Sequence, residues 1–214
     1  MRNITTKTIA LKVILCSFLF VTTISFSQSE VDKVAKQMFI DMNNRDYDAI
    51  LEMSHPKVFE LVSKDQMKDF LKSTIEGNEQ FSIDIPKVIP EYKISKIYKE
   101  EEDNLQYAFV SYDMSMNMTF HDQKFDEEAK KIMASTMKAQ GMDTEFLSEN
   151  TVKIIMNDRI TVILKGDSTK NKWVMMNYDT SSPLVYQVFS TSLLETAKKY
   201  REDLLLESKK KREN

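Results

Sequence analysis

Two long runs of alternating apolar and polar residues constrain the fold of this chain more than any other feature. The runs cover residues 105–120 and Thr151 to Lys165. Both are much longer than a typical strand of about five or six residues. Alternation places one set of side chains on one face of a strand, and a single apolar face must be covered. We therefore predict a curved antiparallel sheet with helices packed against it.

The second run contains one interruption. Its apolar residues share one parity and predict one continuous apolar face: Val152, Ile154, Met156, Ile160, Val162 and Leu164. Asp158 falls within the same row. Asn157-Asp158 could instead form a two-residue hairpin turn, but that pairing would scramble the two faces, so we favour an uninterrupted strand.

Helical patterns surround the two runs. Val31 to Met42 carries an apolar stripe at helical spacing, and further amphipathic helices are expected before Gly77. The segment at about 125–141 predicts an inserted helix, and Leu184 to Glu207 predicts one long C-terminal helix. We expect that helix to cover the face of Leu105, Tyr107 and Phe109, although it could instead project and mediate dimerisation. The predicted class is α+β.

The first 27 residues have the pattern of a secretory signal peptide. Basic residues precede the apolar stretch Ile9 to Ile24, and Ser25-Phe26-Ser27 supplies small residues before a cleavage site at Ser27/Gln28. A membrane anchor is the competing interpretation, but the apolar stretch is short and no charged flank follows it. We expect residues 28–182 to form one domain, followed by the C-terminal helix and basic tail at 183–214.

Cleavage would leave an acidic chain without cysteine. Cys16 is the only cysteine of the 214 residues, so the mature chain would have no disulfide and no thiolate ligand. Loss of Arg2, Lys7 and Lys12 would change the formal net charge from −3 to about −6. We therefore expect no binding to nucleic acid, which requires concentrated positive charge, and we expect a periplasmic or secreted bacterial protein.

The order of these elements resembles the nuclear transport factor 2-like (cystatin-like, SnoaL-like) superfamily over about residues 30–182. The similarity rests on the helix Val31 to Met42, on the phrase Arg45-Asp46-Tyr47-Asp48-Ala49-Ile50, and on Gly166-Asp167 through Lys172-Trp173-Val174. The resemblance implies a cone with an apolar cavity lined by the concave sheet face. Members of the superfamily include isomerases, dehydratases and non-catalytic binding proteins, and no catalytic pattern of theirs is matched here.

Asp158 is the one catalytic candidate. On a straight strand its carboxylate would lie between apolar side chains, where burial raises the pKa of a carboxyl group toward that of a general base. A β-bulge at Asn157-Asp158 would instead turn the side chain out of the apolar row. We favour the bulge.

Methionines dominate the first run. Met114, Met116 and Met118 share one strand face, which is also the arrangement of a thioether site for Cu(I). Methionine is a common core residue, however, and Tyr112 and Phe120 extend the same row, so we favour packing. An apolar face of this kind also suits a ligand pocket.

Other candidates are isolated. His55 and His121 lack the spacing of a metal motif, so we interpret both as surface residues, and we expect no metal or cofactor. The predicted ligand-binding residues are Tyr112, Met114, Met116, Asp158 and Tyr178.

The leading functional hypothesis is an exported, non-enzymatic binding protein of the bacterial envelope. Its partner would be a small apolar ligand or an envelope protein, and a homodimer is possible. The alternative is a metal-independent isomerase or dehydratase that uses Asp158 with Tyr112 or Tyr178.

The signal peptide gives the first testable prediction. Intact mass spectrometry of the protein recovered from a bacterial periplasm should show a chain that begins at Gln28. A recovered chain that retains Met1 would contradict the prediction.

Overall fold

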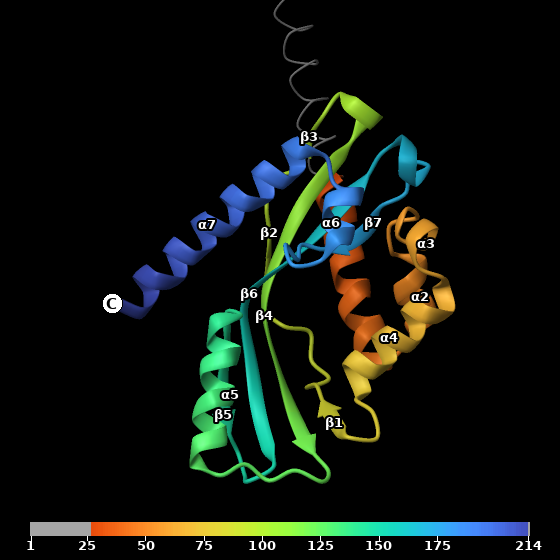
Figure 1. Ribbon diagram of the computed structural model, residues 1–214. Helices are drawn as coiled ribbons and strands as arrows, with labels where there is room; N and C mark the ends of the chain where they lie inside the picture. Colours follow the sequence, from red (N-terminus) through yellow and green to blue (C-terminus); the bar gives the residue numbers. More distant parts are fainter. Residues whose placement is uncertain (1–26, 214) are drawn as a thin grey trace, which may run out of the picture.

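The protein is an α+β structure with helices on both faces of a sheet. The computed structural model describes the backbone of residues 27–213 and the side chains of residues 27–210. Within this range a seven-stranded antiparallel sheet carries helices on either side (Figure 1). The predicted fold class is confirmed. The predicted signal peptide lies outside the described residues except for Ser27.

Four helices precede the sheet. They are residues 27–44, α2 (Tyr47–Glu52), α3 (Val58–Leu61) and α4 (Lys64–Glu76). Local signals set their ends, since Ser63 and Gln66 form a capping box at α4. The helix ends at Gly77, whose φ of 93° is readily available only to glycine.

Two strands form the centre of the sheet. β4 (Gln106–Phe120) and β6 (Thr151–Lys165) pair with each other along their whole length, as the two alternating runs predict. β1 (Phe81–Asp84), β2 (Tyr92–Ile94) and β3 (Tyr98–Lys99) pair with the outer edge of β4. β5 (Met142–Phe146) and β7 (Val174–Asn177) pair with the outer edge of β6.

The remaining helices cover the sheet. They are α5 (Glu127–Ala139), α6 (Pro183–Val188), α7 (Thr191–Glu213) and the short 3-10 turns Glu102–Asn104 and Asp167–Thr169. The inserted helix is confirmed as α5. The predicted long C-terminal helix is confirmed as α7, but its start at Leu184 is wrong. Phe189 is extended and separates α6 from α7, and the Ser190 hydroxyl accepts a hydrogen bond from the Leu193 amide at the start of α7.

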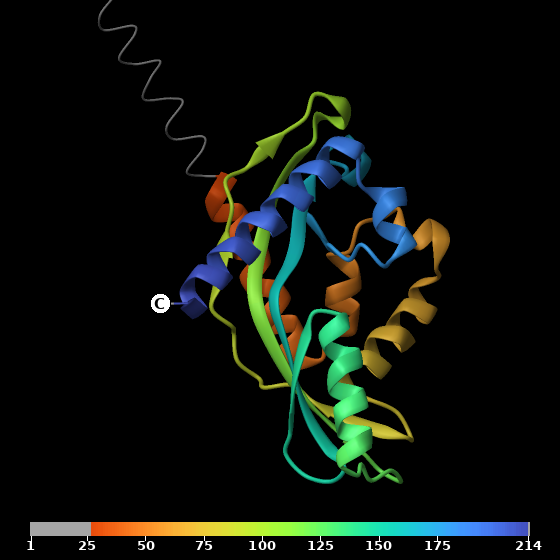
Figure 2. The ribbon, with the colours of Figure 1, turned by 60° about the vertical axis from the view of Figure 1, so that its left-hand side comes forward.

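Both faces of the upper sheet are buried. The helix at residues 27–44 packs Ala35 and Phe39 against Ala108, Val110 and Tyr112. On the other face, α7 covers the odd-numbered residues of β4, and its Leu193 and Ala197 are completely buried. Figure 2 shows α7 in front of these strands and the N-terminal helix behind them. The predicted packing of the C-terminal helix on this face is therefore confirmed.

A β-bulge changes the face that β6 presents. The register with β4 shifts between Tyr112 and Met114, so Asn157 and Asp158 together oppose Asp113. Met156 is therefore a neighbour of Met114, whereas Ile160 is a neighbour of Ser111, and these two β4 residues point to opposite faces. The prediction of one apolar face along β6 is wrong, because the extra residue inverts the alternation.

Each half of β6 consequently contacts a different helix. Val152, Ile154 and Met156 form a cluster with methionines of α5. Ile160, Val162 and Leu164 lie under α7. The Asp158 backbone has a φ of 54°, a conformation in which aspartate is enriched among non-glycine residues. Its amide donates to Asp113 Oδ1 at 2.9 Å, and its carboxylate accepts from Ser208 Oγ of α7, also at 2.9 Å.

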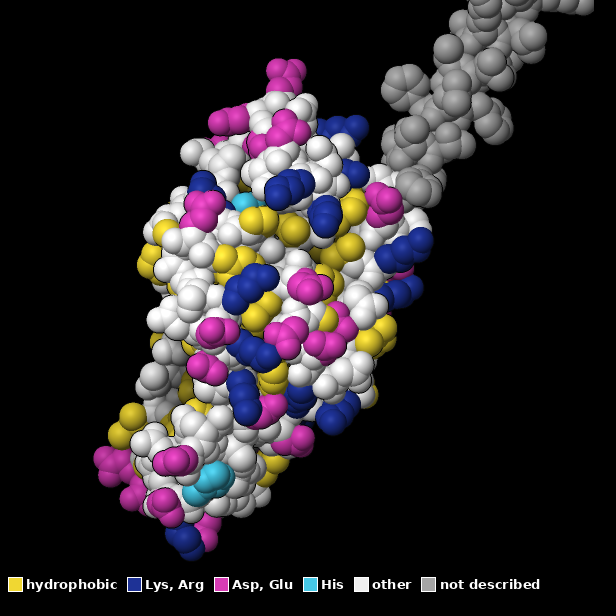
Figure 3. All heavy atoms as spheres, turned by 90° about the vertical axis from the view of Figure 1, so that its right-hand side faces the viewer, with side chains coloured by type: hydrophobic (Ala, Val, Ile, Leu, Met, Phe, Trp, Pro, Cys, Tyr) yellow, Lys and Arg dark blue, Asp and Glu magenta, His cyan; other side chains and the backbone are white. Residues whose placement is uncertain are grey.

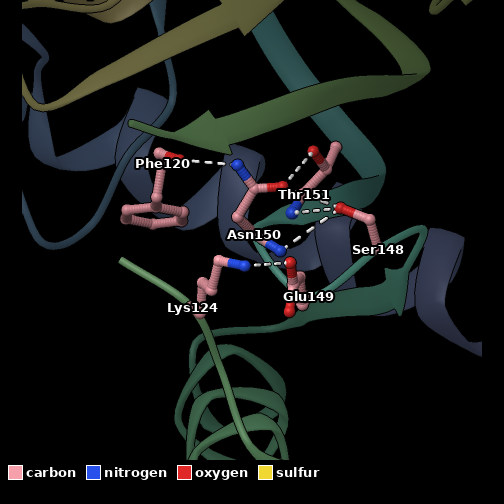
Figure 4. A network of polar contacts seen from close by, with 6 residues as sticks. All are labelled: Phe120, Lys124, Ser148, Glu149, Asn150 and Thr151. Carbon is pink, nitrogen blue, oxygen red and sulfur yellow. Dashed lines mark hydrogen bonds and ion pairs between the residues drawn. The ribbon is translucent and has the colours of Figure 1, made fainter. Parts of the chain in front are cut away.

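Polar contacts close the lower end of the two central strands (Figure 4). The Asn150 side chain donates to the Phe120 carbonyl at 2.9 Å, and the Ser148 hydroxyl accepts from the Thr151 amide at 3.0 Å. Lys124 and Glu149 form an ion pair beside them. These contacts satisfy backbone groups in the β5–β6 turn and hold it against the end of β4.

The bulge gives the second prediction. Asp113→Ala removes the acceptor for the Asp158 amide and should lower the free energy of unfolding by about 1 kcal/mol. Asp113→Asn retains an acceptor oxygen and should remain within about 0.5 kcal/mol of the wild type. Urea denaturation measures both variants. Equal losses in the two variants would show that the carboxylate charge, rather than the hydrogen bond, stabilises the bulge.

Candidate functional site

The outer edges of the sheet are interrupted on both sides of the bulge. On β4, β1 pairs with residues 117–120 and β2 with 110–112, so residues 113–116 have no outer strand. On β6, β5 pairs with residues 152–156 and β7 with 161–164, so residues 157–160 lie outside both pairings. The two gaps lie at the same level of the sheet. Bulges are often found beside functional sites, so we take this level as the candidate site.

A small apolar pocket occupies the gap on the β4 side. Pro86 and Pro90 in the connection between β1 and β2 lack an amide hydrogen, so this segment leaves the sheet edge instead of pairing with it. The pocket has a volume of about 120 Å³. Its apolar lining comes from the N-terminal helix, the β1–β2 connection and β4: Phe39, Met42, Ile85, Pro86, Val88, Pro90, Tyr112 and Met114.

A second pocket, of about 470 Å³, lies between β2 and the end of α7. It is lined mainly by polar side chains, including Glu91, Asp113 and Asp158. An ion pair of 3.5 Å between Lys93 and Glu207 joins its two walls. This pocket is therefore a polar space where α7 approaches the sheet.

A third pocket, of about 510 Å³, occupies the gap on the β6 side. Asp158, Arg159 and Ile160 line it from the bulge, and Tyr178 follows the end of β7. Arg201 of α7 completes its polar wall.

The structure separates the predicted site residues into two groups. Tyr112 and Met114 line the apolar pocket, and Tyr178 and Asp158 line the pocket on the β6 side. Asp158 also lines the second pocket together with Tyr112. Met116 packs with the apolar clusters under the N-terminal helices and α5.

Two of the candidate acid–base groups, Tyr112 and Asp158, already have partners. The Tyr112 hydroxyl lies 3.3 Å from Thr161 Oγ1, and its ring makes an edge contact of 5.0 Å with Phe39. Asp158 lies in a bulge, as we favoured, but it is half-buried and its carboxylate accepts a hydrogen bond from Ser208.

The methionine row is part of the core. Met114, Met116 and Met118 are half-buried and pack with Met133, Met137 and Phe146 around α5. These contacts support the packing interpretation of the row.

The two histidines differ from each other in burial. His121 is exposed, as predicted, but His55 is only 3% exposed, and its Nδ1 accepts a hydrogen bond from the Lys57 amide at 3.2 Å. The prediction of a surface residue is wrong for His55. The adjacent Ser54 forms a bridge with Met175 of β7, so a contact between distant segments holds this turn against the sheet. Within residues 27–210, no group of three or more His, Cys, Asp or Glu side chains is placed to hold a metal ion.

Sequence reasoning missed several residues of the site. Phe39, Met42, Ile85 and Val88 reach the apolar pocket from segments far from β4. The one signal in the sequence is the pair Pro86 and Pro90 on either side of Val88, which indicates that this segment leaves the sheet edge. Arg159 and Arg201 lie 42 positions apart and share no motif, so the pocket on the β6 side could not be anticipated.

Comparison of the chain with protein-family models, curated proteins and solved structures gives no match. Function is therefore argued from the site itself.

Two further observations concern the surface and the helices. Figure 3 views the face that carries α2, α3 and α4, where hydrophobic side chains occur in small groups between charged ones. This face has no broad apolar patch of the kind that marks a large protein interface. Among the described residues, no helix combines the length and the apolar character needed to cross a bilayer.

The buried histidine gives the third prediction. Burial is the main cause that lowers the pKa of His55, and the charge of Lys57 adds to the effect. The folded state therefore favours neutral His55. The resulting contribution to the free energy of unfolding is complete above a pH of about 6.5, the ordinary pKa of histidine, and is lost as the pH falls through the lower pKa of the folded state. Urea denaturation between pH 7.5 and about 5 should show this loss of stability.

His55→Gln should reduce that pH dependence, whereas His121→Gln, which changes the exposed histidine, should retain it. The slopes are compared because His55→Gln also removes buried contacts. An unchanged slope in His55→Gln would contradict the assignment.

Proposed function

We propose that this chain is an exported, non-enzymatic binding protein of the bacterial envelope, and that its apolar pocket holds a small apolar ligand. The observation that carries the proposal is the pocket beside residues 113–116, where Phe39, Tyr112 and Met114 surround a volume of about 120 Å³. Ligand sites are typically concave and mainly apolar, with few polar groups.

The volume defines the size of the ligand. A dry protein cavity of roughly 150 Å³ can hold one benzene molecule. This pocket is smaller, at about 120 Å³, but it is open to solvent at Val88, so one aromatic ring or a short branched aliphatic group can occupy it and extend past the rim. Val88 at its rim is 63% exposed and Ile89 beside it is 47% exposed, so a ligand would also cover apolar surface that is now in contact with water.

The polar groups at this pocket favour binding over catalysis. Asp113 accepts the Asp158 amide, and Arg45 donates to the Met42 carbonyl at 3.0 Å, so both maintain the backbone. The alternative, an acid–base enzyme based on Asp158, requires its carboxylate to reach a tyrosine and a substrate. Asp158 and Tyr178 do line the same pocket, but the Asp158 carboxylate is bonded to Ser208.

We also infer that the fold is a variant of the nuclear transport factor 2-like cone. N-terminal helices followed by a curved antiparallel sheet support this assignment. The helix α5 and the helix α7 would be additions to the simplest form of the cone. In this variant the apolar face is filled by side chains, and the ligand space lies at a gap in the sheet edge.

Export is proposed from the N-terminal sequence. The contacts of the first described residues are compatible with a mature chain that starts at Gln28. The Gln28 side chain donates to the Ser95 carbonyl at 3.1 Å, and Trp173 donates to Glu30 at 3.0 Å. A chain beginning at Gln28 would keep both contacts.

Binding can be tested with toluene as the probe, which gives the fourth prediction. In protein labelled with ¹³C at the methionine methyl groups, toluene should shift the signals of Met42 and Met114, which line the pocket. Val88→Asp places a charge at the exposed rim and should weaken binding several-fold, because the ligand would desolvate that charge.

A matched control is Ile132→Asp on α5, since Ile132 is similarly exposed at 61% but lies outside the pocket. It should bind toluene like the wild type. Shifts spread over all methionines, or equal weakening in the two variants, would contradict the proposed pocket.

A further inference from the structure

The pocket on the β6 side differs in chemistry from the apolar pocket. It lies at the opposite edge of the sheet, where residues 157–159 pair with neither β5 nor β7. The Ile160 carbonyl accepts from the amide of Tyr178, directly after β7, at 2.9 Å. Met142 and Met156 form an apolar part of its wall, and Arg159 and Arg201 add two guanidinium groups. Its volume of about 510 Å³ is enough for a small organic molecule.

The two arginines have no strong partner in the described protein. Neither forms an ion pair or a hydrogen bond through its guanidinium group with another described residue. Both are nevertheless close enough to Asp179 to act on it. The hydrogen bonds from Ser181 are the main cause that lowers the pKa of Asp179, and the charges of Arg159 and Arg201 lower it further.

Asp179 does not neutralise the arginines by direct contact. Its Oδ1 accepts hydrogen bonds from the Ser181 amide at 2.9 Å and the Ser181 hydroxyl at 2.6 Å. Through these hydrogen bonds Asp179 stabilises the turn after β7. The guanidinium donors of Arg159 and Arg201 thus remain available to a ligand on the same wall.

The backbones of both arginines are held by the packed elements that carry them. Arg159 directly follows the bulge and pairs with Tyr112 in the sheet. Arg201 lies on α7 between Ala197 and Leu204, which are buried against the sheet. Tyr178 is half-buried beside them, and burial raises the pKa of its phenol, which therefore stays a hydrogen-bond donor. Donors held on rigid elements bind a ligand at a lower entropic cost.

We propose that this pocket binds a small organic carboxylate, with the carboxylate on Arg159 and Arg201 and the apolar body against Met142 and Met156. A guanidinium group binds a carboxylate through two parallel hydrogen bonds. Asp158 and Asp179 also belong to this lining, although neither contacts the arginines directly, so a phosphate dianion would meet more repulsion from these carboxylates than a carboxylate monoanion. The apolar wall favours an organic ligand over an inorganic ion.

The test uses benzoate as the probe and the ¹³C-methionine protein at low ionic strength. Benzoate should bind in the millimolar range or more tightly and shift the methyl signals of Met142 and Met156. Arg159→Gln and Arg201→Gln should each weaken binding about tenfold, the effect of losing a charge-assisted hydrogen bond. Arg201→Lys should have an intermediate affinity, because it keeps the charge but loses the planar fork.

Lys198→Gln is the matched control, since it removes one positive charge from the same exposed helix outside the pocket. It should bind benzoate like the wild type, and thermal melting should show that all variants are folded. Absence of benzoate binding, or equal weakening by Lys198→Gln, would overturn the proposal. Binding of inorganic phosphate in preference to benzoate would overturn the carboxylate assignment.

The readout also separates this site from the apolar pocket. Benzoate contains a ring and could enter the other gap, where it would shift Met42 and Met114 instead. Shifts confined to those two methionines would overturn the carboxylate site and leave the apolar pocket supported.

Discussion

The bulge at Asn157 and Asp158 is the constraint on which the rest of the structure depends. Apart from Asp158, one parity of β6 is apolar, and a regular strand would direct all of these residues to one face. The bulge inverts the alternation, so the first half of β6 contacts α5 and the second half contacts α7. One strand thereby supplies apolar residues to two cores on opposite faces of the sheet.

The same irregularity explains why the pockets occur where they do. A regular sheet would carry edge strands along the whole length of β4 and β6. Here the edge strands stop on both sides of the bulge, and the two gaps receive different side chains. The gap on the β4 side is apolar because Pro86 and Pro90 lead an apolar connection past it. The gap on the β6 side is polar because Arg159 and Arg201 meet there.

Much of the secondary structure could be predicted from the sequence, but the site could be predicted only in part. Alternation over residues 105–120 and 151–165 predicted both central strands, since side-chain periodicity is a local property. Tyr112 and Met114 line an apolar pocket in the structure, and their part in ligand binding stays a prediction. Arg201 was missed because its position depends on how α7 crosses the sheet, and no local pattern encodes that crossing.

The sequence by itself determined the elements of this protein: alternating runs form strands, capping residues such as Ser63 begin helices, and glycines such as Gly77 end them. The tertiary structure decided which face each apolar row occupies. A single extra residue opposite Asp113 reverses every later side chain of β6, and only pairing with β4 fixes where that residue is accommodated. It also decided that His55 is buried and that the two arginines meet, because burial and proximity arise from contacts between distant segments.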